Sequence, residues 1–125
     1  MANILIVDDA SFMRNSLRYL MNSSGHVVVG MAKDGKEALE MYKRLKPDLI
    51  TLDILMKEMD GITTLKELLK INPSVKVVMV TAFGHDWKQK EASEIGAIGF
   101  IRKPFKQSEI IETIEKALGK NKIYV

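Results

Sequence analysis

Two hydrophobic patterns alternate along the chain, and each predicts a different kind of element. Short, nearly unbroken apolar runs are typical of buried strands, and they occur at residues 3–7, 27–31, 48–53, 76–82 and 97–101. Between these runs, apolar residues recur every three or four positions, which is the spacing of one helix face. The helices predicted in this way cover residues 11–25, 34–47, 62–73, 87–96 and 107–119.

The first predicted helix shows how the pattern assigns an inward face. Its apolar positions at helical spacing are Phe12, Met13, Leu17, Leu20 and Met21. Gly25 stops this helix, and Pro47 ends the next one. We therefore expect both helices to lie with an apolar face against the sheet.

Five predicted strands thus alternate with five predicted helices. This alternation favours parallel pairing, with helices on both faces of the sheet. The strongest strands are apolar throughout, as strands buried on both faces are. The sequence therefore predicts an α/β fold, a doubly wound five-stranded parallel sheet with five helices. Ligands of such sheets bind beyond the carboxyl ends of the strands, so the side chains there are the candidates for function.

Composition narrows the class of protein. A chain of 125 residues with 46% hydrophobic and 28% charged residues has the size and core of one domain. It contains no apolar run of the ~18 residues needed to span a membrane, and "MANILIVDDA" lacks the features of a signal peptide. The absence of cysteine excludes disulfides and thiolate metal sites, and agrees with a cytoplasmic location. The net charge of +3 forms no compact basic stripe, which favours a solvated lysine-rich surface over nucleic-acid binding.

Polar side chains stand at the ends of four predicted strands. The first strand ends in Asp8 and Asp9, the third in Asp53, the fourth in Thr81 and the fifth in Lys103. Each has an ordinary structural explanation by itself: an acid caps a helix or braces a turn, threonine favours strands, and lysine is surface charge. Together they share the edge where this architecture binds ligands, which favours a functional site.

Three carboxylates gathered at one edge repel one another. Two unit charges ~5 Å apart repel by about 3 kcal/mol at an effective dielectric constant of ~20, and three pairs approach ~10 kcal/mol before screening. A helix cap offsets only about 1 kcal/mol. Either the acids are partly protonated or a cation holds them together. Ligands that are all oxygen favour Mg²⁺, and no histidine stands at a strand end to favour zinc or iron.

A cation-bound carboxylate that faces a lysine and a hydroxyl suits a phosphoryl group. A carboxylate can act as a nucleophile and form an aspartyl phosphate. Lys103 would neutralise charge on the phosphoryl oxygens, and Thr81 would donate a hydrogen bond to one of them. The residues alone do not decide which carboxylate attacks. Asp53 is the preferred nucleophile because it stands alone on the central strand, whereas Asp8 and Asp9 form a pair placed to hold the ion.

Four motifs occur in the order "LIVDD", "LDILMKEMDG", "VTA" and "GFIRKPF". In combination they resemble the receiver domains of bacterial and archaeal response regulators, especially the stand-alone CheY-like regulators, and "DDASFMR" points toward the chemotaxis type. The resemblance implies a receiver domain over residues 1–119, with residues 120–125 as a short tail and no output domain. It also implies the sheet order 2-1-3-4-5 of flavodoxin-like and CheY-like folds.

The resemblance assigns roles to the acids. Asp53 matches the phosphoacceptor, Asp9 a direct Mg²⁺ ligand, and Asp8 the acid that helps to hold the ion, often through water. The backbone carbonyl of Leu55 would be a further ligand.

It also assigns a switch at the other strand ends. Thr81 and Lys103 match the pair that grips the phosphoryl group, and Phe100 matches an aromatic side chain that turns inward when Thr81 moves. Without the other motifs, Phe100 would be interpreted as a plain core aromatic. The bond between Lys103 and Pro104 matches one that is cis in this family.

Three positions depart from the family pattern. Lys57 stands where the family usually has proline, which places a cation near the acidic site. Leu55 and Phe83, two positions after Asp53 and Thr81, are apolar. Because neither side chain can orient an attacking water, we expect slow loss of the phosphoryl group.

The resemblance implies a single-domain response regulator of a two-component system. It would be a signalling module that catalyses only its own phosphorylation and dephosphorylation. A sensor histidine kinase or acetyl phosphate would be the donor. The target would be a downstream protein, such as a flagellar motor switch or a phosphotransfer protein, bound by a monomer in the cytoplasm. A phosphatase is a further expected partner, whereas nucleic acid and membranes are not expected.

Other functions remain open at this point. A relay intermediate would hand its phosphoryl group to a histidine, and would not need Phe100. A Mg²⁺-dependent aspartyl phosphatase of the haloacid-dehalogenase type needs a second Asp two residues after the nucleophile, where this chain has Leu55. A flavin-binding module is disfavoured because "DDASFM" would repel phosphate. A DNA-binding role is disfavoured because no segment remains for a helix-turn-helix.

Overall fold

A computed structural model describes residues 1–82 and 86–119 of the chain. Its sheet has five strands among these residues, β1 (Asn3–Val7), β2 (Val27–Ala32), β3 (Leu49–Asp53), β4 (Val77–Ala82) and β5 (Gly99–Lys103). All neighbouring pairs are parallel, and the order across the sheet is β2-β1-β3-β4-β5. The predicted doubly wound sheet and its 2-1-3-4-5 order are confirmed.

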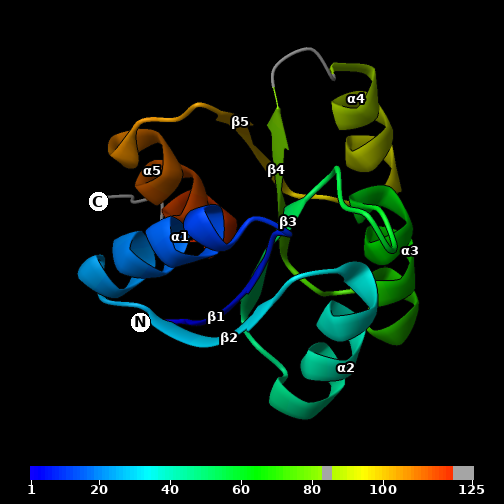
Figure 1. Cartoon of the computed structure of the whole chain (residues 1–125), viewed down its shortest axis with the longest axis horizontal. Helices are drawn as coiled ribbons and strands as arrows, with labels where there is room; N and C mark the ends of the chain where they lie inside the picture. The colour runs from blue at the N-terminus through cyan, green and yellow to red at the C-terminus, as the bar shows by residue number, and fades with distance from the viewer. Residues whose placement is uncertain (83–85, 120–125) are drawn as a thin grey trace.

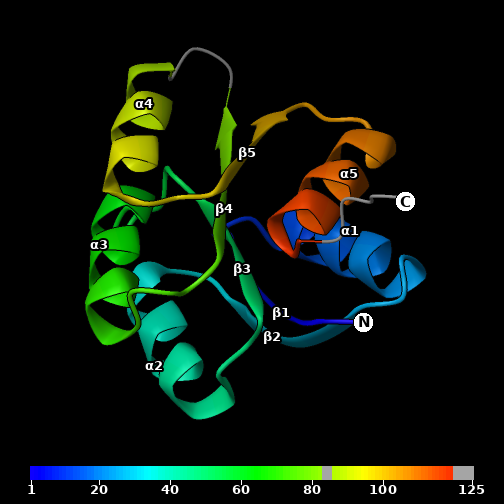
Figure 2. The same ribbon diagram turned by 180° about the vertical axis from the view of Figure 1, so that it is seen from behind.

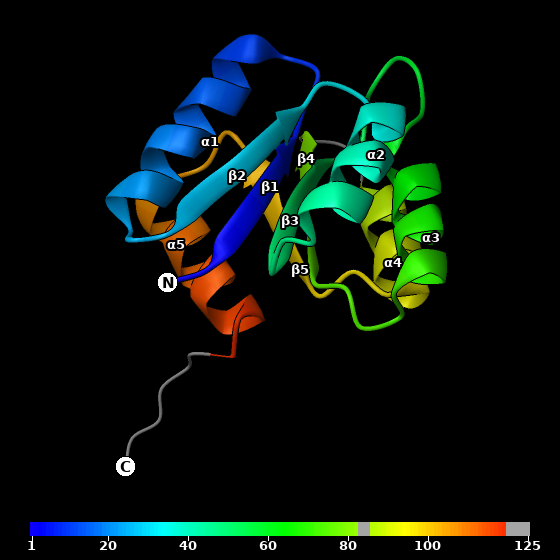
Figure 3. The ribbon, with the colours of Figure 1, turned by 90° about the horizontal axis from the view of Figure 1, so that it is seen from below.

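Helices cover both faces of the sheet (Figures 1 and 2). They are α1 (Ser11–Ser23), α2 (Gly35–Leu45), α3 (Gly61–Ile71), α4 (Asp86–Ile95) and α5 (Gln107–Ala117). Helices α1 and α5 lie together on one face, and α2, α3 and α4 line up along the other (Figure 3). None of the described helices is long and apolar enough to cross a membrane.

Each face of the sheet has its own apolar core, because successive strand residues point to opposite faces. On one face Leu17 of α1 and Ile110 of α5 pack against strand residues such as Ile4 and Ile6. On the other face, residues of α2, α3 and α4 pack against strand residues such as Leu52. The central strand β3 is buried along its whole length, as its continuous apolar sequence predicts.

The expected inward face of α1 is wrong at one position. Leu17 and Met21 are buried as predicted, whereas Phe12 is 79% exposed. Met13, the next residue, packs against the core from the same turn, whereas Phe12 lies in line with Tyr19, which is 70% exposed. The predicted apolar face was therefore too wide, because it included a residue that lies beside the buried face.

Side-chain caps fix where α2 and α3 begin at the carboxyl edge of the sheet. The carboxylate of Asp34 accepts a hydrogen bond from the backbone N–H of Glu37, and that of Asp60 accepts one from Thr63. Such caps satisfy backbone donors that the first turn of a helix leaves unpaired. At the start of α3, a side chain on Gly61 would collide with the backbone carbonyl oxygen of Asp53. The glycine therefore allows α3 to begin directly against the end of β3.

The edge strand β2 is not paired evenly with β1. Asn3 and Ile4 face Val27 and Val28, but the next partner of the chain is Gly30, so the register skips Val29. One extra residue in an edge strand bends it and interrupts its ladder of hydrogen bonds.

Candidate functional site

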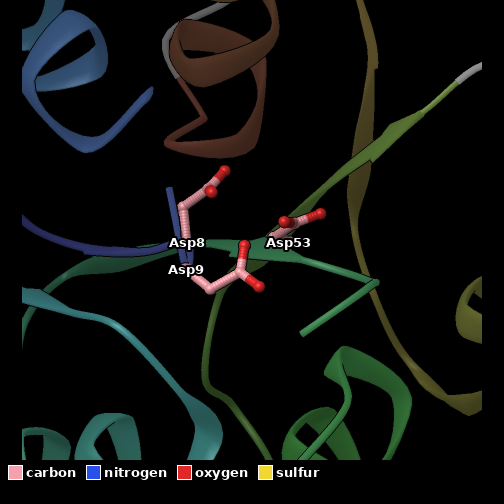
Figure 4. A group of neighbouring side chains, drawn as sticks. All are labelled: Asp8, Asp9 and Asp53. Atoms are coloured by element: carbon pink, nitrogen blue, oxygen red, sulfur yellow. The ribbon is translucent and has the colours of Figure 1, made fainter. Parts of the chain in front are cut away.

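Three carboxylates from two strand ends meet at the carboxyl edge of the sheet (Figure 4). Asp8 and Asp9 follow β1 and Asp53 ends β3, and one oxygen of each lies within 4.8 Å of the others. Asp8 and Asp53 are buried, with 1% and 6% of their surface exposed, whereas Asp9 is exposed. Strands β1 and β3 are adjacent and pair Val7 with Leu52, which places the residues that follow side by side.

Neither acid of the first strand acts as the cap of α1. Its N-cap residue is Ala10, which makes no side-chain cap hydrogen bond. Instead, one carboxylate oxygen of Asp8 accepts a hydrogen bond from the backbone N–H of Ala10 at 2.9 Å. The guanidinium of Arg14 donates to the backbone carbonyl of Asp8 at 2.7 Å. Asp8 is thus held in place by α1, and its other oxygen faces the site.

The lysine of the fifth strand reaches the acids across β4. The Nζ atom of Lys103 lies 3.0 Å from one oxygen of Asp8 and 3.5 Å from one oxygen of Asp53. The side chain of Lys103 is 23% exposed, so these ion pairs are partly shielded from water. One ammonium therefore offsets part of the repulsion between two buried acids, and the third acid faces solvent.

The pKa of Asp53 is raised from 3.8 to about 6. Burial is the main cause, and the negative charge of Asp8 adds to it, with a smaller contribution from Asp9. The ammonium of Lys103 and a hydrogen bond from the Leu55 backbone lower the pKa, but by less. A positive charge placed beside Asp53 would therefore stabilise its ionised carboxylate.

Thr81 and Phe100 lie on the other side of the sheet from Lys103. Phe100 packs against the core beneath α2, α3 and α4, and its strand partner is Met79 of the same core. Thr81, two residues after Met79, shares that face by strand alternation, and its buried hydroxyl donates to the carbonyl of Ala82 at 3.2 Å. Phe100 is half-buried, and it lines a cavity of about 380 Å³ toward α4 and one of about 560 Å³ toward α5.

A mixed-charge cavity opens beside the acids. It measures about 240 Å³ and is lined by Asp9, Lys33, Asp34, Lys57 and Glu58. These residues come from the loops after β1, β2 and β3. The predicted positions Asp9 and Lys57 therefore share one cavity. Phe83 lies outside the described residues.

A model of the response regulator receiver domain matches residues 4–115. The chain belongs to this family. Among curated proteins, it is 46% identical over 113 residues to the chemotaxis protein CheY of Thermotoga maritima, covering 90% of this chain and 94% of that one. It is 44% identical over 116 residues to CheY of Bacillus subtilis, covering 93% and 97%. The predicted resemblance to CheY-like receivers is confirmed.

Solved structures agree with the fold. The crystal structure of the CheX–CheY–BeF₃–Mg²⁺ complex of Borrelia burgdorferi contains a chain with a TM-score of 0.88 and 34% identity, covering 91% of this chain and 87% of that one. The response regulator domain of Thermotoga maritima CheB has a TM-score of 0.86 and 37% identity, covering 96% and 98%.

The receiver site has the donors that Mg²⁺ requires. The three clustered ligands are all carboxylate oxygens, from Asp8, Asp9 and Asp53, and Mg²⁺ takes oxygen ligands and retains several waters. The exposure of Asp9 leaves that side of the cluster open to such waters. Burial, and then the charge of Asp8, raise the pKa of Asp53 although Lys103 lies beside it, so a divalent cation that favours the ionised carboxylate fits the site. The role of the Leu55 carbonyl as a ligand stays a prediction.

Sequence reasoning missed several residues that shape the receiver site. Arg14 donates to the backbone carbonyl of Asp8, and Gly61 packs against the backbone carbonyl of Asp53. A single sequence contains no pattern that predicts either contact. Lys33 directly follows the second strand, and Lys57 lies in the loop after the third strand. Both lysines therefore follow strand ends at the carboxyl edge, and this position could have identified Lys33 from the sequence. The Lys103–Pro104 peptide bond is cis, as the resemblance implies.

Proposed function

We propose that this receiver domain accepts a phosphoryl group on Asp53, with Mg²⁺ bound by Asp8, Asp9 and Asp53, and that this step switches a protein-binding surface. A sensor histidine kinase or a small acyl phosphate is the donor, and the relatives named CheY favour a role in chemotaxis signalling in the cytoplasm. The observation that carries the proposal is the meeting of three carboxylates and Lys103 at one sheet edge.

The chemical step follows from the position of Asp53. An oxygen of its ionised carboxylate attacks phosphorus, the bond between phosphorus and the donor breaks, and the bonding electrons leave with the donor's carboxylate or imidazole. The pKa of about 6 leaves most Asp53 side chains ionised at neutral pH. Bound Mg²⁺ would supply positive charge for the phosphoryl oxygens. Lys103 needs only to exchange its contact with the Asp53 carboxylate for one with the new phosphoryl group.

The switch follows from the two faces of the sheet. Charge-assisted hydrogen bonds from Thr81 and Lys103 to the phosphoryl group would contribute ~1.5–3 kcal/mol each. Their sum of ~3–6 kcal/mol brackets the ~5.5 kcal/mol that moves a two-state equilibrium from 1:99 to 99:1, so the shift can be incomplete without a partner. Withdrawal of the Thr81 hydroxyl toward the edge makes room on its face, and the half-buried ring of Phe100 lies on that face between two cavities. A partner that prefers the active form completes the shift.

The surface that changes would be formed by α4, β5 and α5 around Phe100. Trp87 on α4 is 64% exposed, and the Nζ of Lys88 lies 4.4 Å from the centre of its ring. Exposed aromatic side chains of this kind are common anchors of protein interfaces. A target protein that binds here would sense the state of Asp53. The Borrelia burgdorferi relative, whose structure was solved in complex with CheX, supports the expectation of a protein partner.

Incubation of the protein with Mg²⁺ and acetyl phosphate, followed by intact-mass spectrometry, tests the proposal. The wild-type chain should gain one phosphoryl mass, and Asp53→Asn should gain none. Asp60→Asn is the matched control, because it removes a carboxylate of the same loop while asparagine keeps the helix cap of α3. If the wild type gains no mass, the proposed function is wrong. If Asp53→Asn gains as much as the wild type, another residue is the acceptor.

A further inference from the structure

Two lysines whose ammonium groups form no ion pair among the described residues line the mixed-charge cavity beside the acids. Lys33 and Lys57 are exposed, and neither ammonium forms an ion pair with any residue that the structure describes. Both line the same cavity as Asp9, whose carboxylate belongs to the acidic cluster. Both residues therefore lie beside Asp9, at the exposed side of the proposed metal site.

The backbone holds Lys33 at this cavity. Its N–H donates to the carboxylate of Glu37 at 2.8 Å, and the next residue, Asp34, caps α2. Because Asp34 accepts a backbone hydrogen bond at a helix N-terminus, the helix dipole offsets part of its charge. Lys57 reaches the cavity from the opposite loop, next to Glu58.

The lysines lower the negative charge of the cavity, and they make its net charge positive once a divalent cation is bound. Its lining carries three acids and two lysines, so its formal charge is −1, and without the lysines it would be −3. The carboxylate of Asp9 would be neutralised as a ligand once a divalent cation binds. What then faces an incoming donor is the cation and two ammonium groups, opposed by Asp34 at its helix cap and by Glu58. That arrangement favours an anion over a second cation.

We propose that Lys33 and Lys57 determine the ligand preference of this site. They weaken the binding of a free divalent cation, and they strengthen the binding of a phosphoryl anion to the cation-loaded protein. The lysines therefore shift the preference of the site away from the free cation and toward the phosphoryl anion. This inference rests on the proposed function, because it assigns a regulation to that same site.

The two effects are opposite in sign and can be measured separately. Isothermal titration calorimetry of the full chain with Mg²⁺ alone measures the first. A titration of the Mg²⁺-loaded protein with beryllofluoride, a phosphoryl mimic, measures the second. The variants are Lys57→Gln, Lys33→Gln and the double substitution. Lys43→Gln is the matched control, because it removes the same charge from the last turn of α2, eight residues beyond the start of that helix.

The double variant should bind Mg²⁺ about 3- to 10-fold more tightly than the wild type at low ionic strength, and each single variant should show part of this gain. The gain should shrink at ~0.5 M salt, because the Debye length then falls below ~5 Å. Beryllofluoride should bind the Mg²⁺-loaded double variant about 2- to 5-fold more weakly. The control should match the wild type in both titrations.

The outcomes separate this inference from the proposed function. If the wild type binds Mg²⁺ and accepts a phosphoryl group but the double variant binds Mg²⁺ no more tightly, this inference is wrong and the proposed function stands. If tighter Mg²⁺ binding comes without weaker beryllofluoride binding, the proposed effect of the lysines on the phosphoryl anion is wrong. If the wild type binds no Mg²⁺, both fall together. Thermal unfolding of each variant confirms that these exposed substitutions leave the fold intact.

Discussion

The two edges of the same sheet treat polar groups in opposite ways. At the amino edge, donors and acceptors match: the backbone N–H of Asn3 donates to Asp48 at 2.8 Å, and that of Ala2 donates to the Nδ1 of His26 at 3.1 Å. The Nε2 of His26 lies 2.7 Å from the carboxylate of Glu115. At the carboxyl edge, three acids share one cluster, and one lysine bridges only two of them.

This difference shows that the amino edge stabilises the fold, whereas the carboxyl edge keeps a repulsion between carboxylates that a bound ligand can relieve. The amino edge links the start of the chain, β2 and α5 through a histidine whose side chain is 3% exposed. Because Nδ1 accepts a hydrogen bond, the proton of the neutral ring lies on Nε2 and is donated to Glu115. Buried polar groups with matched partners stabilise a fold, whereas gathered like charges destabilise it until a ligand compensates them. Removing a polar side chain should therefore destabilise the fold at the amino edge and stabilise it, without metal, at the carboxyl edge.

The largest effect should come from the backbone contact that builds the carboxyl edge. Gly61→Ala would place a methyl group against the Asp53 carbonyl, which must move for α3 to fit. We expect a loss of about 3 kcal/mol in the free energy of unfolding, together with weaker Mg²⁺ binding. Urea denaturation measures the first and calorimetry the second. Thr63→Ala, at an exposed position of the same helix, should stay within about 0.5 kcal/mol of the wild type.

The amino edge should respond next. His26→Ala removes a buried ring and leaves the N–H of Ala2 without its acceptor, so we expect a loss of about 2–3 kcal/mol. Glu115→Gln keeps an oxygen acceptor for Nε2 and should cost less than about 1 kcal/mol. Urea denaturation measures both. Phosphorylation by acetyl phosphate should be unchanged in Glu115→Gln, and a loss of phosphorylation there would mean that the two edges are not independent.

Removing an acid from the carboxyl edge should have the opposite sign. The pKa of Asp53 is about 6 in the fold against 3.8 as the ordinary value, so the folded state holds this proton more tightly than the unfolded chain does. The contribution of Asp53 to stability is therefore highest below pH ~4 and falls as the pH rises to ~6. In metal-free buffer at pH 7, Asp53→Asn should be more stable than the wild type by about 1–2 kcal/mol, after allowing for solvent screening.

The pH dependence provides the control for that prediction. The advantage of Asp53→Asn should disappear near pH ~3, below the ordinary pKa of 3.8, where the wild-type side chain is mostly protonated in both states. Added Mg²⁺ should reverse it at pH 7, because only the wild type keeps all three carboxylates. Urea midpoints of the two proteins, measured at both pH values with EDTA or Mg²⁺, test this. Equal stability at pH 7 without metal would contradict a destabilising carboxyl edge.

The smallest effect should come from the middle of the sheet. The hydroxyl of Thr51, on β3 between the two edges, is buried without a hydrogen-bond partner among the described residues. Thr51→Val replaces it with a methyl group of similar size and should stabilise the fold by about 1 kcal/mol. Thermal unfolding with EDTA and with Mg²⁺ should show the same gain. A loss of stability would mean that this hydroxyl has a partner, such as an ordered water.

Much of this structure could be predicted from the sequence because it rests on local patterns. Continuous apolar runs identify strands such as β3, and alternation with helical spacing predicts the layers. The meeting of Asp8, Asp9 and Asp53 follows from parallel strands, whose carboxyl ends share one edge. The order of the strands came from the family resemblance, since periodicity does not specify it.

The remaining features depend on contacts between distant parts of the chain. His26 and Glu115 are 89 positions apart, and no spacing rule connects them. Phe12 matched the helical pattern yet is exposed, because approximate spacing does not fix how wide an arc of the helix contacts the sheet. The shared cavity of Lys33 and Lys57 likewise depends on how two loops approach each other.

The skipped residue of β2 has a consequence beyond this domain. An exposed sheet edge is a template on which a second chain can add a strand, and it invites aggregation when it is long and regular. The register skips Val29 and therefore offers an intruding strand two short segments instead of one continuous ladder. The valine-rich edge strand β2 can thus pack against the core while being a poor template for the growth of fibrils.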